Sequence, residues 1–135
     1  VENLKTIQSN FPKIKTSNFN LENHQNIEEL VKEAKEKLGG LDIVINNAGV
    51  TKDNLAIRMS HEEWNKVINI NLTAVFLICK YSIKVMMKQD SGSIINISSI
   101  VGHTGNFGQA NYSSAKAGII AMSKSLAKEY AKKKY

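Results

Sequence analysis

The sequence predicts an α/β fold built on a parallel β-sheet. Two short runs rich in β-branched residues, Asp42–Asn46 and Ser93–Ser98, have the length and composition of buried strands. Segments with helical periodicity precede, separate and follow these runs. Strands that alternate with helices pair in parallel through right-handed crossovers. In such sheets the working residues gather at the carboxyl ends of the strands.

The first forty residues are predicted to form a helix, a weak strand and a second helix. Apolar residues recur with helical spacing over Val1–Asn10, and a Phe-Pro pair ends that run. Weak alternation predicts an edge strand over Lys13–Leu21. Ile27–Leu38 carries one apolar face, with Asn23 or Asn26 available as its cap and two glycines at its end.

A long helix is predicted from Glu62 to Lys88. Ser60 is placed to cap it, and two acidic residues lie in its first turn, where the helix dipole favours them. Its apolar residues fall on several faces: Val67, Ile70, Val75, Phe76, Ile78 and Met86. A helix that is apolar nearly all round is buried on more than one side. We therefore expect this helix and the helix Asn111–Lys132 to lie at an interface between subunits.

The last predicted helix carries a tyrosine and a lysine four residues apart, Tyr112 and Lys116, and continues to Ala131. Residues with this spacing share a helix face, so the phenol and the ammonium point into the same space. An ammonium beside a phenol stabilises the phenolate, and such a tyrosine can exchange a proton with a carbonyl or alcohol oxygen. Taken alone, the pair is weak evidence, because a tyrosine and a lysine with this spacing more often form an exposed surface pair.

Small polar residues follow both predicted strands. Asn46-Asn47-Ala48-Gly49 comes after the first strand and Ser98-Ser99 after the second, thirteen residues before Tyr112 in the case of Ser99. A serine in this position also serves simply to complete a turn. Asn71 lies inside the apolar helix, where an amide is costly unless it is hydrogen-bonded. A satisfied core amide or a helix kink is the alternative to a functional role for Asn71.

In this order and spacing, these residues resemble the classical short-chain dehydrogenase/reductase family. The loops Val50–Leu55 and Gly105–Tyr112 most resemble its 3-oxoacyl-acyl-carrier-protein reductases. The resemblance implies a Rossmann-like doubly wound parallel sheet, present here only in its central part. Residues 1–135 are then expected to be a fragment of one NAD(P)-binding reductase domain, without its N-terminal Gly-rich loop and C-terminal substrate region. Gly102–Gly108 follows the later strand and does not spell G-x-G-x-x-G.

The resemblance also implies the chemistry and the site residues. The activity would be NADPH-dependent reduction of a 3-oxoacyl thioester to the 3-hydroxyacyl thioester in fatty-acid synthesis, with NADH as the alternative donor. Tyr112 would supply the proton, Lys116 would steady the phenolate and the nicotinamide ribose, Ser99 would donate a hydrogen bond to the reacting oxygen, and Asn71 would hold a water. The cofactor would contact Asn20, Leu21, Asn47, Ala48 and Gly49, together with Tyr112 and Lys116.

Acyl carrier protein, or a free acyl thioester, is the partner that the resemblance implies. The basic run Lys132–Lys134 suits an acidic carrier, but Asp90 stands where family members often have a basic residue. Coenzyme-A thioesters and other ketones or alcohols therefore remain alternative substrates. A truncated, non-catalytic homologue that acts as an interaction partner is the alternative of a different class.

Bulk composition narrows the class of protein further. The net charge is +6, but the lysines are spread along helices without aromatic residues between them, which argues against nucleic acid. The single cysteine, Cys79, excludes a disulfide framework and fits a reducing, cytoplasmic compartment, with organellar targeting left open. The three histidines have no second ligand at metal spacing. We expect no membrane span and a homodimer or homotetramer.

Overall fold

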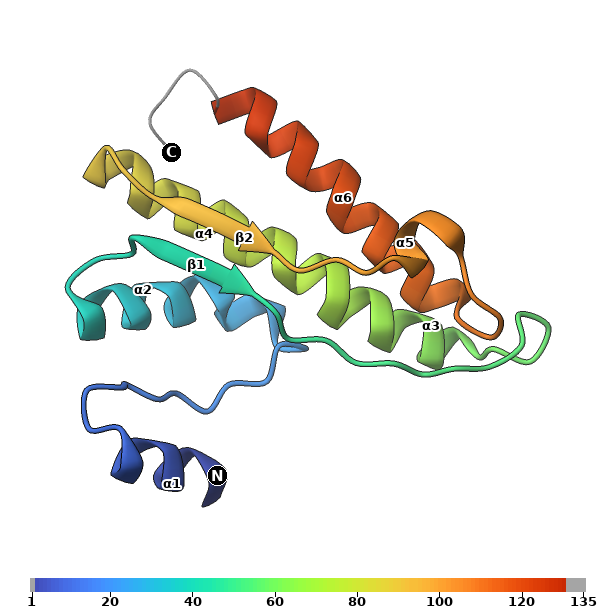
Figure 1. Ribbon diagram of the computed structural model, residues 1–135, viewed down its shortest axis with the longest axis horizontal. Coiled ribbons are helices and arrows are strands. Elements are labelled where there is room, and N and C mark those ends of the chain that lie inside the picture. The colour runs from blue at the N-terminus through green and yellow to red at the C-terminus, as the bar shows by residue number, and fades with distance from the viewer. Residues whose placement is uncertain (1, 131–135) are drawn as a thin grey trace.

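The computed structural model of the chain describes residues 2–130 (Figure 1). In chain order the elements are α1 (Glu2–Asn10), a 3₁₀ turn η1 (His24–Asn26), α2 (Ile27–Leu38), β1 (Ile43–Asn46), α3 (His61–Ile68), a π-helical segment η2 (Asn69–Thr73), α4 (Ala74–Gln89), β2 (Ser93–Asn96), α5 (Val101–Thr104) and α6 (Ala110–Tyr130).

The two strands lie side by side in parallel, as the sequence predicts (Figure 1). Val44 is opposite Ile94, and Asn46 is opposite Asn96. A further bond from the Ile97 amide to the Asn46 carbonyl, 3.0 Å, extends the pairing beyond the carboxyl ends of both strands. The long helical run α3–η2–α4 forms the crossover between them. The carboxyl ends of β1 and β2 therefore meet at one edge of the sheet.

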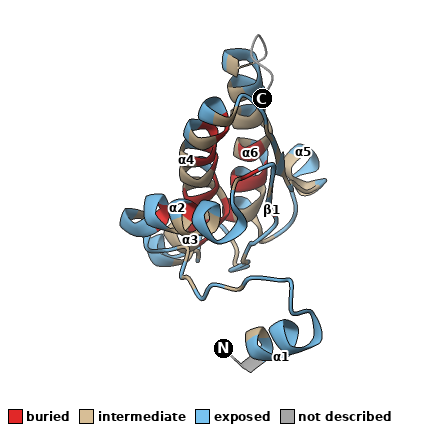
Figure 2. Cartoon of the chain, turned by 90° about the vertical axis from the view of Figure 1, so that its left-hand side faces the viewer, coloured by how far each residue is buried: buried red, intermediate tan, exposed pale blue. Residues whose placement is uncertain are grey.

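One face of this sheet carries the core, and the helices α2, α4 and α6 cover it. Val44 and Ile94 pack against buried residues of these helices: Val31, Val75, Cys79, Met86 and Ile119. Figure 2 shows buried segments along α4 and α6. The opposite face is apolar but open, since Ile43 and Ile45 are 63% and 60% exposed. Within residues 2–130 the fold is thus a parallel sheet with one face covered by helices, in agreement with the predicted α/β, Rossmann-like fold class.

The helical run from His61 to Gln89 begins with a capping box. Ser60 Oγ accepts from the Glu63 amide at 3.1 Å, and the Glu63 carboxylate accepts from the Ser60 amide at 2.8 Å. This confirms Ser60 as the cap. The run also has the length and apolar composition of a membrane span, contrary to our expectation that no segment would. A core helix passes the same test, and 44% of its most apolar window is buried here.

Three local predictions differ from the structure. The edge strand over Lys13–Leu21 is wrong, because this segment has no strand partner within residues 2–130 and forms no regular structure. A strand exists only where a neighbour supplies hydrogen bonds. The structure also has a helix, α5, between β2 and Tyr112, where no helix was expected. Asn26 precedes α2 but makes no side-chain capping bond. The predicted glycine end of α2 is confirmed, because Gly39 ends that helix in the left-handed conformation, φ 79°.

Candidate active site

The site lies where the carboxyl ends of β1 and β2 meet α6. Asn46 Nδ2 donates to Asn96 Oδ1 at 2.8 Å, and Asn96 Nδ2 donates to Ser123 Oγ of α6 at 2.9 Å. These amides tie the two strand ends to each other and to the helix. Sequence reasoning missed Asn96 and Ser123. Asn46 and Asn96 occupy matching positions on the two strands, and this match can be recognised only once the register of the strand pair is known.

The turn after β1 passes directly over two predicted site residues. Asn47, Ala48 and Gly49 are exposed. A Cβ added to Gly49 would lie 3.2 Å from Asn71 Oδ1 and 3.9 Å from Lys116 Nζ. A side chain at this position would therefore crowd Asn71 and meet Lys116 at an ordinary contact distance, and glycine lets the backbone pass close to Asn71. The structure thus brings together Gly49, Asn71 and Lys116, which are far apart in sequence.

Asn71 is a satisfied core amide. It is 1% exposed and lies in the π-helical segment η2, where its Oδ1 accepts from the Val50 amide at 2.8 Å and its Nδ2 donates to the Val50 carbonyl at 2.7 Å. Pairing with both backbone groups of Val50 offsets the cost of burying the amide. It also fixes the loop after β1 against the long helix. A π-helical turn at a site residue is a recurring feature of functional sites.

Tyr112 and Lys116 share a face of α6, as their spacing predicts. Lys116 Nζ lies 5.6 Å from the centre of the Tyr112 ring and donates to the Ile97 carbonyl at 2.8 Å. Lys116 is only 5% exposed, and no carboxylate of residues 2–130 forms an ion pair with it. Burial lowers the pKa of Lys116. The arrangement places a buried cationic group beside a half-buried phenol.

Asn111 positions the start of α6 and was missed by sequence reasoning. It is fully buried; its Oδ1 accepts from the Tyr112 amide at 2.7 Å, and its Nδ2 donates to the carbonyls of Lys52 at 2.9 Å and Glu63 at 3.3 Å. One amide therefore connects the Tyr112 backbone to the loop after β1 and to α3. The adjacent Gln109 adds a bond to the Asp53 carboxylate.

The two serines after β2 have different surroundings. Ser98 Oγ donates to the Lys116 carbonyl of α6 at 2.8 Å. The Ser99 hydroxyl makes no hydrogen bond to any residue that the structure describes, while its carbonyl accepts from the Gly102 amide at 3.0 Å. Ser99, which is half-buried, thus has a hydroxyl available to another group. Its neighbour Ser98 is engaged with the helix.

Two predicted cofactor contacts are not brought into this cluster by any hydrogen bond within residues 2–130. The Asn20 side chain accepts from the Glu22 amide at 3.0 Å, which completes a local turn. Leu21 is half-buried beside it. The basic run Lys132–Lys134 lies outside the described residues. No group of three or more His, Cys, Asp or Glu side chains that could hold a metal ion occurs among residues 2–130.

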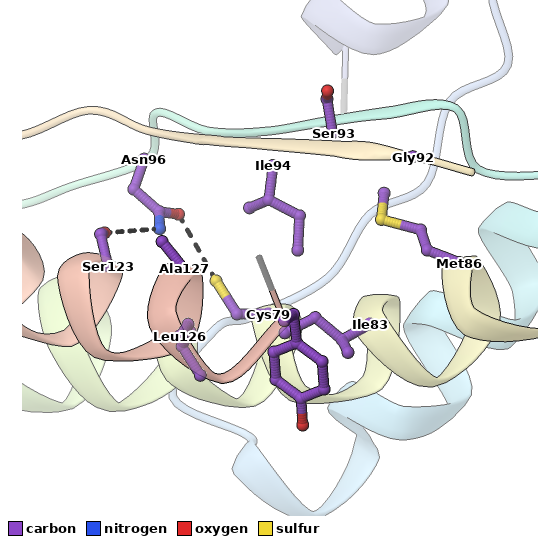
Figure 3. Close-up of a pocket in the computed structure, with 11 residues that line it drawn as sticks. Cys79, Ile83, Met86, Gly92, Ser93, Ile94, Asn96, Ser123, Leu126 and Ala127 are labelled. Carbon is purple, nitrogen blue, oxygen red and sulfur yellow. Dashed lines mark hydrogen bonds between the residues drawn. The ribbon is translucent and has the colours of Figure 1, made fainter. Parts of the chain in front are cut away.

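A cavity of about 370 Å³ lies between β2, α4 and α6, and Asn96 and Ser123, which tie β2 to α6, line it (Figure 3). Neither Tyr112 nor Lys116 lines it. Figure 3 shows Ile94 and Cys79 facing each other across it, with the Cys79 sulfur 3.5 Å from Asn96 Oδ1. Burial raises the pKa of the Cys79 thiol, so the sulfur stays protonated and unreactive. The lining of this cavity includes the exposed residues Ser93 and Ala127, so the cavity reaches the surface.

Comparison with known proteins identifies the family of this chain. Residues 1–134 match the model of a family described as short chain dehydrogenase. The 3-oxoacyl-[acyl-carrier-protein] reductase of Vibrio cholerae serotype O1 is 48% identical over 113 residues, 84% of this chain and 46% of that protein. The enzyme of the same name from Synechocystis sp. is 50% identical over 112 residues, 83% of this chain and 45% of that protein.

A relative with another name covers more of the chain. Nodulation protein G of Rhizobium sp. is 46% identical over 132 residues, 97% of this chain and 54% of that protein. The chain thus spans about half the length of the curated relatives it matches.

Proposed function

Because this chain belongs to the short-chain dehydrogenase family, we propose that the protein that carries it reduces a 3-oxoacyl thioester, held on acyl carrier protein, to the 3-hydroxyacyl thioester. The observation that carries the proposal is the placement of Lys116 Nζ beside the Tyr112 ring and under Gly49. The names of several relatives at 46% to 50% identity support the choice of substrate.

The residues present fit a nicotinamide cofactor. The turn Asn47–Gly49 is exposed and made of small residues, so a flat ring or a ribose has access to its backbone. Beneath that turn, Lys116 offers a buried ammonium that has no carboxylate partner among residues 2–130. These residues would hold NADPH, with NADH as the alternative, and the cofactor would supply the hydride. Asn20 and Leu21 are proposed as more distant contacts.

Each site residue then has a distinct role in the proposal. Tyr112 donates its hydroxyl proton to the substrate oxygen as the carbonyl carbon is reduced. Lys116 stabilises the phenolate that remains, through its charge in a water-poor setting. Ser99 donates a hydrogen bond to the same oxygen, which supports the charge that develops there.

Asn71 has capacity beyond its pairing with Val50. An amide has two donor hydrogens and two acceptor lone pairs, and Val50 uses one of each. We assign the remaining donor or acceptor to a water near Lys116, which would return a proton to the site. The pairing itself keeps the loop after β1 in place, so Asn71 serves both purposes.

A second candidate is the same reduction on a different ketone or thioester. Asp90, exposed at the end of α4, places a negative charge where an acidic carrier would favour a positive one. The similarity to nodulation protein G, over 97% of this chain, also extends beyond the proteins named as carrier-protein reductases. Comparing turnover of acetoacetyl-carrier protein with that of acetoacetyl-coenzyme A distinguishes the two candidates.

Compartment and assembly belong to the same proposal. The single cysteine is buried and unpaired, which suits the reducing cytoplasm. We propose a homodimer or homotetramer in which the long helical run and α6 meet their copies. We propose neither nucleic acid nor membrane lipid as a partner, because the proposed reduction requires neither.

The Tyr112→Phe variant tests the mechanism in the full-length protein that carries this chain. The ring remains while the proton donor is lost, and a positioned acid is worth about 10²–10⁴-fold in rate. We expect kcat for acetoacetyl-carrier protein to fall by about that factor, with NADPH affinity by fluorescence titration nearly unchanged. Tyr81→Phe in α4 is the matched control and should keep full activity. Unchanged kcat in Tyr112→Phe would refute the mechanism.

A further inference from the structure

Lys116 is held at three points by the segment that follows β2. Its ammonium donates to the Ile97 carbonyl at 2.8 Å. Its own carbonyl accepts from Ser98 Oγ, also at 2.8 Å. Its backbone contacts Gly102 of α5 so closely that an added Cβ would lie 2.8 Å from the Lys116 carbonyl carbon. The segment from Ile97 to Gly102 therefore contacts both the ammonium and the backbone of Lys116.

The Ser98 bond is additional to the helix. A carbonyl inside an α-helix already accepts from the amide four residues later. The hydroxyl uses the second lone pair of the Lys116 carbonyl. The Ser98 bond and the Gly102 contact both involve the backbone of Lys116, so they fix the distance between that turn of α6 and the end of β2. The bond from the ammonium to Ile97 fixes the far end of the side chain. The position of the ammonium therefore depends on both ends of Lys116 being held.

From these contacts we infer that Ser98 is a positioning residue for the proposed reduction, which holds Lys116 where its ammonium faces Tyr112. This inference rests on the proposed function. It separates two adjacent serines, since Ser98 is engaged with α6 while the Ser99 hydroxyl is unengaged within residues 2–130. Ser99 remains the residue proposed to contact substrate, and Ser98 acts through Lys116.

Three variants of the full-length protein test the inference by activity. Ser98→Ala should lower kcat/KM about three- to tenfold, the range expected for one lost neutral hydrogen bond. Ser98→Thr keeps a hydroxyl and should recover at least half of the activity. Ser114→Ala, an exposed serine of α6, is the control and should not change kcat/KM. Failure of threonine to restore activity would overturn a role for the hydroxyl.

A double-mutant cycle separates positioning from general stability. In a Lys116→Met background, Ser98→Ala should change kcat/KM by less than about twofold, because its effect passes through the ammonium. A purely structural role predicts the same three- to tenfold loss in both backgrounds, and that result would refute the inference. Thermal melts of each variant confirm that the proteins compared are folded.

A measurement without turnover keeps the inference separate from the proposed function. Acetic anhydride labelling, scored by mass spectrometry, compares buried Lys116 with exposed Lys124 as the internal reference. Ser98→Ala should raise the relative labelling of Lys116 at least about threefold, and Ser98→Thr and Ser99→Ala should not. If the wild-type protein reduces no thioester, the proposed function fails, and this labelling alone decides the role of Ser98. Unchanged labelling of Lys116 in Ser98→Ala would overturn it.

Discussion

At the scale of single residues, Lys116 is a buried charged side chain whose lost hydration costs free energy of folding. An ammonium that is 5% exposed and bonded to one carbonyl has lost most of its hydration without gaining an ion pair among residues 2–130. Burial therefore lowers its pKa. A buried, unpaired charge is a common sign of a functional group, because structure alone would favour an apolar side chain there.

Replacing Lys116 by methionine should raise stability while it removes activity. A lysine whose pKa is lower in the folded state destabilises the protein at pH values below that folded pKa. As pH rises through the folded pKa towards the ordinary value of about 10.4, the wild type regains this stability. We expect Lys116→Met to melt at a higher temperature than wild type at pH 7, by a margin that narrows towards pH 10.

Lys124→Met, on an exposed position of α6, is the matched control and should leave the melting temperature nearly unchanged at both pH values. Melting curves at five pH values between 6 and about 10 are sufficient. A Lys116→Met protein that is less stable than wild type at every pH would show that the bond to Ile97 outweighs the cost of burial.

At the scale of elements, the close approach of α5 and α6 determines the geometry behind the site. Gly102 lies so near the α6 backbone that an added Cβ would be 2.8 Å from the Lys116 carbonyl carbon and 2.9 Å from the Ala117 nitrogen. Backbone atoms cannot turn away as a side chain can, so the two elements can remain this close only with glycine at position 102.

Gly102→Ala should lower the free energy of unfolding by about 1–3 kcal/mol, the usual cost of overpacking. The measurement is urea denaturation of the full-length protein. Gly40→Ala is the control and should cost less: its Cβ would lie 3.3 Å from Gln89 Oε1, a side-chain atom that has to shift by only a few tenths of an ångström while it accepts from the Leu41 amide. Equal stability of Gly102→Ala and Gly40→Ala would contradict the close backbone contact between α5 and α6.

At the scale of the whole molecule, described residues 2–130 have a core on one side of the sheet only. Ile43 and Ile45 are more than half exposed on the open face. The sequence also contains no G-x-G-x-x-G motif between a strand and a helix. A dinucleotide normally rests its pyrophosphate on such a loop and the helix that follows. Residues 1–135 thus contain the residues of the proposed site without a loop of this kind.

The 135-residue chain by itself should therefore bind NADPH weakly, with a Kd above about 100 μM. A Kd of 1 μM would correspond to a favourable binding free energy of about 8.2 kcal/mol. Nicotinamide fluorescence and calorimetry both report this, with the full-length protein that carries the chain as the control. Micromolar binding by the chain alone would show that Asn47–Gly49 and Lys116 hold the cofactor without a Gly-rich loop.

Self-association is the second prediction at this scale. The structure leaves fewer apolar residues of the long helical run available for an interface than the sequence pattern predicts. Most of the apolar residues of the long helical run are covered within the chain: Val67, Ile70, Val75 and Met86 are buried. What remains is a set of exposed apolar side chains on the same run, Trp64, Phe76 and Met87, at 37%, 42% and 39%. Phe76 and Met87 are about three turns apart on α4 and therefore share a face, and exposed apolar residues that gather on one face mark a partner site.

Phe76→Glu should convert an oligomer of the full-length protein to smaller species in light scattering at micromolar concentration. A charge at a buried contact is costly unless it is paired. Ile57→Glu, at a residue that is 92% exposed in a loop, is the matched control and should leave the mass unchanged. A fully active monomer in the wild type would rule out the interface.

The sequence by itself determined the elements and the principal chemical pair. Both strands, the helices α2 and α6, the cap at Ser60 and the shared face of Tyr112 and Lys116 follow from patterns among near neighbours, which the chain carries locally. The π-helical turn at Asn71 and the helix α5 were not predicted, because small shifts in helical pattern leave no clear periodic signal.

Only the tertiary structure decided how the site is held together. Asn111 bonds to Lys52, Ser98 to Lys116, and Asn46 to Asn96, each across many intervening residues. The prediction of a strand over Lys13–Leu21 was wrong, because a strand forms only beside a neighbouring strand, and the local sequence does not specify that neighbour. Periodicity records which face of an element is buried; which partner a buried polar group finds depends on elements that meet only after folding.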